Sequence, residues 1–415
     1  MAEEVERRTI GLDAFAVREH RSLWKDAWRR LVSSNTARAG MAIVALFLLS
    51  AILAHFFWPY NPKVDGDYSL KLKPPNLLPN ADVRSIHPFG TDINGRDIFR
   101  RVVHGGWNSL RVGLVAVGIS LSVGGLLGLL AGFYESMPVG TLGRVALIGG
   151  VGALLGAIPS WLADRPYPAL LLGGLGVAAA VADRFLRHEE SEISLPRTAV
   201  FSLAGLVLTG LPVLSVGPAA ALVCGLFGLV IGAIVSLPLG GPLFSNVIMR
   251  LMDLILAFPG ILLAIAIVTM LGPGLERAMI AIGIVGIPTY ARLARAQVLS
   301  VIQEEYVTAA RTIGAGHGRI LFRHILPNTL SPIIVQATMG LAGAILWAGA
   351  LGFLGLGAIP PEPEWGAMLS DGYKYLASGS WWAVLFPGLA IMLSVLGFNL
   401  LGDGLRDALD PRLRI

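Results

Sequence analysis

The chain of 415 residues is 54% hydrophobic and only 14% charged, with a formal net charge of +5 at pH 7 and a mean hydropathy of +0.69. A soluble domain carries about 25% charged residues, so these values exclude soluble, disordered and fibrous proteins. The apolar runs are long and unbroken, whereas barrel strands alternate apolar and polar residues over about 10 positions. Each helical crossing takes about 20 apolar residues, so the composition predicts an all-α polytopic membrane protein.

The N-terminal part divides into a tail and two spans. Residues 1–38 are polar and rich in arginine, which predicts a cytoplasmic tail under the positive-inside rule. Residues 39–137 hold the first two spans, joined over 59–106 by a polar segment of mixed charge that we expect on the extracytoplasmic side. The basic residues lie beside apolar runs, so they are topology signals and do not indicate nucleic-acid binding.

The second span carries Gly124, Gly128 and Gly132 at four-residue spacing. Glycines so spaced form a flat stripe on one face of a helix, where another helix can approach closely. We therefore expect this span to pack tightly against a neighbour.

Residues 138–244 consist mostly of apolar and small residues and predict an inserted bundle of about four spans. An even number of crossings returns the chain to the side it left. Residues 245–402 predict four more spans, one of them over about 251–271, and a basic segment at 297–327 that we expect in the cytoplasm. With a cytoplasmic tail at 403–415, the scheme gives about ten spans across the cell membrane and places both termini in the cytoplasm.

Residue patterns of common enzymes are missing from the sequence. None of the five lysines follows the glycine-rich run with which a P-loop holds phosphates. The run His188–Glu192 resembles an intramembrane metalloprotease signature, but Glu192 occupies the place of the second histidine ligand. The single cysteine, Cys224, forms no disulfide within the chain and no cysteine-based metal site. We expect no catalytic residue and no metal here.

A motif in the basic segment points to a family. The chain reads EYVTAARTIG from Glu305 and HILPN from His324, which resembles the EAA loop of ATP-binding-cassette importer permeases. Thr308 stands where that family has its glutamate, with Glu305 one turn earlier. The resemblance implies a short helix that docks in a groove of an ATPase subunit, and a glycine can end such a helix in a left-handed cap. The residues assigned to this coupling loop are Glu305, Thr308, Ala309, Ala310, Gly314, Leu326 and Pro327.

Two further motifs resemble the dipeptide, oligopeptide and nickel permease group, and specifically its C-type subunit. One reads HPFGTDINGRD from His87, and the other reads NLLGDGLRDALDPR from Asn399. In the first, the glycines imply tight turns, and the charged residues can fix the loop by charge-assisted hydrogen bonds. We expect a structural role there, with direct substrate contact as the alternative. The residues of this signature loop are Gly90, Thr91, Asp92, Gly95, Arg96 and Asp97.

The resemblance implies a type I importer transmembrane domain that forms half of a pore for di- or oligopeptides. Its implied partners are a B-type permease, two ATPase subunits carrying ATP and Mg, an extracytoplasmic binding protein and membrane lipid, but no nucleic acid. The chain itself would hold no cofactor, and the residues that bind substrate stay unknown. The alternatives are the same importer group carrying nickel or another small solute, and an ion-coupled carrier with interrupted helices. The low polarity of 138–244 favours a peripheral bundle there.

Overall fold

The computed structural model describes most of the chain outside one long internal stretch. The predicted inserted bundle lies outside the described residues except for its last three positions, as do the outer parts of both predicted tails. The described ranges are 23–58, 60–61, 66–78, 85–136 and 242–409.

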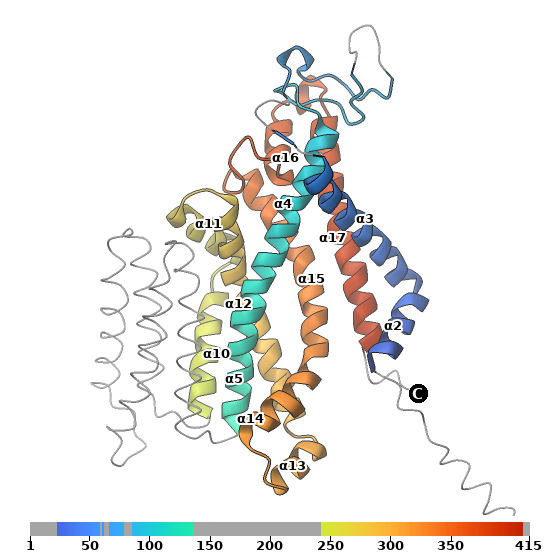
Figure 1. Cartoon of the computed structure of the whole chain (residues 1–415). Helices are drawn as coiled ribbons and strands as arrows, with labels where there is room; N and C mark the ends of the chain where they lie inside the picture. Colours follow the sequence, from blue (N-terminus) through green and yellow to red (C-terminus); the bar gives the residue numbers. More distant parts are fainter. Residues whose placement is uncertain (1–22, 59, 62–65, 79–84, 137–241, 410–415) are drawn as a thin grey trace, which may run out of the picture.

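Within these ranges the regular structure is helical, as predicted, apart from isolated β-bridges in the loop before the second span. Five helical stretches are long and apolar enough to cross a membrane, or up to six if a bent pair counts as one span. They lie side by side in Figure 1. Three of the five are single helices: α3 (Asn35–Phe57), α12 (Leu275–Val301) and α17 (Trp382–Leu409). The stretch Ile98–Ser136 consists of α4 (Ile98–Ile119), a π-helical turn (Ser120–Gly124) and α5 (Gly125–Ser136). The stretch His317–Phe353 consists of α14 (His317–Arg319), a π-helical turn (Ile320–Ile325) and α15 (Leu326–Phe353).

Three short helices flank these spans. The helix α2 (Leu23–Ser33) precedes α3, α13 (Glu305–Thr312) follows α12, and α16 (Trp365–Tyr373) lies between α15 and α17. Figure 1 places α13 and α16 at opposite ends of the bundle, so the predicted coupling segment and the predicted extracytoplasmic loops are far apart.

The second span begins earlier than its apolar run suggests. The Asp97 carboxylate accepts a hydrogen bond from Arg100 N at 2.9 Å and so caps α4, which starts at Ile98 inside the segment predicted to be a loop. At about 1.5 Å per residue, the continuous stretch to Ser136 is roughly twice as long as a hydrocarbon core of about 30 Å. The first turns of α4 therefore extend beyond the apolar layer.

The span predicted over about 251–271 is not one continuous helix. It consists of α10 (Pro242–Leu256) and α11 (Gly260–Leu271), which are bent by 91° at the break between them. Pro259 caps α11, and a proline lacks the N–H that a continuous helix would need at this point. The predicted span is therefore corrected to a broken one.

The glycine stripe confirms the expected close approach of two helices. A Cβ atom added to Gly124 would lie 2.3 Å from the carbonyl oxygen of Ile287, and one on Gly128 would lie 2.1 Å from that of Ala291. Gly132 faces the same neighbour, α12. No larger residue fits at these positions unless the two backbones separate.

A three-residue contact joins both ends of the long internal stretch. The Ser245 hydroxyl, at the start of α10, donates to Oε2 of Glu135, at the end of α5, at 2.8 Å. Arg295 of α12 donates from Nη2 to the same oxygen at 2.7 Å and from Nε to the Ser245 hydroxyl at 2.8 Å. The residues just before and just after the long internal stretch are thus hydrogen-bonded to each other and to α12.

Candidate functional site

The coupling segment forms the short helix that the motif predicts. Gly314 has a φ of +79°, and its N–H donates to the Arg311 carbonyl at 2.9 Å. Ala315 N–H donates to the Ala310 carbonyl at 3.0 Å. These two bonds and the left-handed glycine make a Schellman cap, which ends α13 abruptly.

The two faces of α13 have different surroundings. Val307 and Ala310 are buried on the inner face, and Val307 belongs to an apolar cluster shared with Ile302 and Ile320. Ala310 therefore contacts its own chain, whereas we expected both alanines to face a partner. Ala309 is exposed on the outer face.

The outer face also presents Glu305 and Thr308, which are both exposed. Next to the cap, Ile313 is 85% exposed, which is unusual for a large apolar side chain with water around it. The sequence motif did not single out Ile313, although an isoleucine beside the capping glycine of a polar segment was a usable signal.

Leu326 and Pro327 lie where two kinds of helical turn meet. Leu326 packs at the edge of the same apolar cluster, and Pro327 is the second residue of α15, directly after the π-helical turn Ile320–Ile325. A proline has no N–H to donate, so the Leu-Pro pair lies where the hydrogen-bond pattern of the stretch changes.

At the other end of the bundle, the signature loop contains the two tight turns that its glycines predict. Gly90 and Gly95 have φ values of +74° and +70°. A Cβ atom on Gly90 would lie 2.7 Å from the ring of Trp382, and one on Gly95 would lie 1.7 Å from the carbonyl oxygen of Asp67. Both the backbone angle and the lack of space require glycine here.

Asp92 fixes the loop from inside. Its Oδ1 accepts hydrogen bonds from the backbone N–H groups of Asn94 and Arg96, each at 2.8 Å. Its Oδ2 forms an ion pair at 2.5 Å with Arg101, and both side chains are buried. The charged partner of Asp92 is therefore Arg101 on α4, and Arg96 contributes its backbone N–H.

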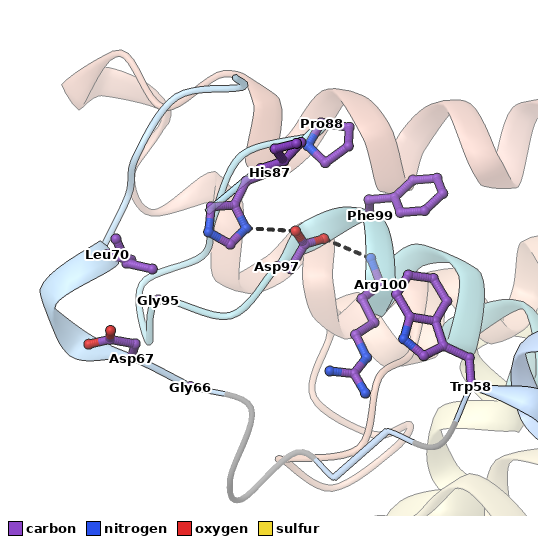
Figure 2. Close-up of a pocket in the computed structure, with 11 residues that line it drawn as sticks. Trp58, Gly66, Asp67, Leu70, His87, Pro88, Gly95, Asp97, Phe99 and Arg100 are labelled. Atoms are coloured by element: carbon purple, nitrogen blue, oxygen red, sulfur yellow. Dashed lines mark hydrogen bonds and ion pairs between the residues drawn. The ribbon is translucent and has the colours of Figure 1, made fainter. Parts of the chain in front are cut away.

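Asp97 and Thr91 tie the loop to two helices. Oδ1 of Asp97 caps α4, and Oδ2 accepts from Nδ1 of His87 at 2.7 Å (Figure 2). The Thr91 hydroxyl accepts from Lys73 N at 2.8 Å, and its carbonyl accepts from the Trp382 indole at 3.2 Å. These contacts support the structural role that we predict for the signature residues.

The loop also encloses a hollow of about 470 Å³ against the end of α3, shown in Figure 2. The Arg100 guanidinium lies over the rings of Trp58 and Tyr60, 5.4 Å from each centroid. Asp67 is fully exposed at this hollow, and hydrogen bonds from the Ser69 hydroxyl and N–H lower the pKa of its carboxyl group. The hollow is thus lined by aromatic rings and charges of both signs.

Glu364, the residue before α16, is 1% exposed, and its carboxylate caps that helix by accepting from Gly366 N and Ala367 N at 2.8 Å each. It lies in the loop between α15 and α17, outside the spans. Burial raises the pKa of Glu364 to about 7, against the opposing effect of the two N–H donors. Among the described residues, no group of three or more His, Cys, Asp or Glu side chains is placed to bind a metal ion.

Comparison with known proteins gives consistent matches along the chain. The family model "Binding-protein-dependent transport system inner membrane component" matches residues 227–415, and "N-terminal TM domain of oligopeptide transport permease C" matches residues 22–75.

Individual relatives agree with these matches. A dipeptide transport system permease protein of Alkalihalophilus pseudofirmus is 38% identical over 395 residues, which cover 95% of this chain and 91% of the relative. A glutathione transport system permease protein of Pectobacterium atrosepticum is 33% identical over 394 residues, covering 95% and 93%. A dipeptide transport system permease protein of Escherichia coli K12 is 55% identical over 168 residues, covering 40% and 56%.

Proposed function

The chain belongs to the family of binding-protein-dependent transport system inner membrane components, and from this premise we propose that it carries di- or oligopeptides across the membrane. It is a multi-pass permease subunit of an ATP-binding-cassette importer, and it is not itself an enzyme. The relatives named for dipeptide and glutathione transport support a peptide cargo, since glutathione is itself a tripeptide.

Importers of this family work with ATPase subunits and a substrate-binding protein. In our proposal the pore has two halves, and a B-type permease supplies the second. Two ATPase subunits then bind ATP and Mg on the cytoplasmic side, where both termini of this chain also lie. The binding protein docks at the opposite end, against the signature loop.

The division of α13 into two faces carries the coupling part of the proposal. The outer face, with Ala309 and Ile313, is free to contact an ATPase subunit, while Val307 on the inner face is buried in the apolar cluster. That cluster also contains Phe133 of α5, Met252 of α10 and Val298 of α12. A push on α13 would therefore reach three spans together, which links ATPase closure to the state of the pore.

Replacement of Ile313 tests this directly. We expect Ile313→Asp to reduce peptide-stimulated ATP hydrolysis by at least tenfold in the reconstituted complex, because a carboxylate would be desolvated at the contact. Val32 on α2 is also an exposed apolar residue but lies outside the coupling segment. Val32→Asp is therefore the matched control and should leave hydrolysis unchanged. Normal stimulated hydrolysis by the Ile313→Asp complex would contradict the assignment of the coupling helix.

A further inference from the structure

An exposed ion pair joins α10 and α12, which belong to two candidate spans. Arg292 of α12 and Asp253 of α10 are 2.6 Å apart, and their side chains are 52% and 47% exposed. Arg292 lies one helical turn from Arg295, towards the middle of α12, so the pair is farther from the cytoplasmic end than the contact of Arg295 with Glu135. Two formal charges thus point away from this chain within a span.

The helix that carries Asp253 is interrupted one turn farther on. Ala257 N–H donates to the Asp253 carbonyl at 2.9 Å, which places Ala257 directly above Asp253 on the same face. Ala257 and Pro259, at the 91° break, are exposed. Thr289, three residues before Arg292, is exposed on α12. The face therefore combines two charges, a hydroxyl and interrupted backbone with exposed apolar side chains such as Leu254 and Phe258.

Hydrocarbon does not cover such a face. Non-helical backbone at membrane depth is tolerated only where protein covers it or where it lines a water-filled cavity. Charged residues in spans likewise face a cavity or a partner, and the short Asp253 side chain cannot reach the membrane surface as a long arginine can. The purely apolar exposed side of α3, with Leu46 and Leu49, is by contrast suited to lipid.

We propose that this face lines the translocation path and that Asp253 and Arg292 bind the two charged ends of a passing peptide. The inference rests on the proposed peptide cargo. A peptide zwitterion carries an ammonium group that suits Asp253 and a carboxylate that suits Arg292. An exposed ion pair contributes little stability, so a peptide can replace either partner and leave again, as transport requires.

Capped peptides separate the two roles. In proteoliposomes with the complete complex, Asp253→Asn should lower transport of a free tripeptide at least fivefold relative to wild type, and should lower transport of the N-acetylated tripeptide by less than twofold. Arg292→Gln should show the same difference between the free and the C-amidated tripeptide. Taking the ratio of variant to wild type for each peptide cancels the preference of the binding protein. Asp407→Asn, an exposed carboxylate at the end of α17, is the control and should change neither ratio.

Equal losses for free and capped peptides, or no loss, would overturn the proposal. If the wild-type complex does not transport capped peptides, thiol labelling in a Cys224→Ser background tests whether this face lines the path. Ala257→Cys should react with a membrane-impermeant maleimide in the assembled complex, and free tripeptide should slow that reaction. Leu46→Cys should resist labelling, and an unreactive Ala257→Cys would refute the assigned path. Wild-type complex that transports no peptide at all would instead refute the proposed function.

Discussion

The two ends of the molecule use their polar residues in opposite ways. In the signature loop, the carboxylate oxygens of Asp92 and Asp97 accept hydrogen bonds from neighbouring backbone N–H groups and from the side chains of Arg101 and His87. On α13, Glu305 and Thr308 are exposed beside Ile313. Both segments carry family motifs, so a motif does not by itself say whether its residues hold a fold or meet a partner. The surroundings of each side chain make that distinction.

The sharpest test of the structural end is Asp92→Ala. Removing this carboxylate leaves the buried Arg101 guanidinium without its counter-charge, which costs about 3–5 kcal/mol. We expect the variant to show a markedly lower thermal unfolding temperature and poor assembly, measured by fluorescence-detected gel filtration of the purified complex. If the variant unfolds at the wild-type temperature, the loop is not held by this pair.

Glu364 provides a test that depends on pH. Its folded-state pKa of about 7 exceeds the ordinary value of 4.5, so the folded protein binds more protons than the unfolded chain between these values. Stability should therefore fall as pH rises from about 4.5 to 7, by on the order of 1–3 kcal/mol. Thermal unfolding across this range measures the effect. Glu364→Gln should flatten the profile, and an unchanged slope in that variant would assign the pH dependence to another group.

The smallest expected effect on stability is at the coupling end. Gly314 has a left-handed φ but nothing within 4 Å of an added Cβ, so Gly314→Ala should cost only about 1–2 kcal/mol. We expect the complex to assemble and to lose part of its peptide-stimulated ATP hydrolysis, because the cap of α13 is disturbed. Gly314→Asn should retain more activity, since asparagine tolerates this conformation. Equal activity of the two variants would show that the cap is unimportant.

The features that could be predicted correctly from the sequence are those determined by residues close together in the chain. Hydropathy located the five long spans, and glycine spacing predicted that the second span packs closely against a neighbouring helix, because both signals are local. The left-handed cap at Gly314 also follows from a single residue type. The exposed and buried sides of α13 did not follow, because Ala309 and Ala310 are equivalent in sequence and differ only in what surrounds them.

The break at Pro259 illustrates another limit. Prolines at 288, 332 and 387 lie inside α12, α15 and α17, which stay helical, so a proline in an apolar run does not identify a break. Membrane helices accommodate prolines when neighbouring groups satisfy the freed carbonyls. The ion-pair partner of Asp92 could not be predicted either, because Arg101 comes within reach of Asp92 only when α4 begins at Ile98.

The contact of Glu135, Ser245 and Arg295 also bears on how the chain tolerates changes in length. Residues 136 and 242 flank the long internal stretch, and the three-residue contact holds together the helices on either side of it. We therefore expect α5, α10 and α12 to keep their packing when the number of residues between 136 and 242 changes. An engineered domain is then best inserted at this boundary.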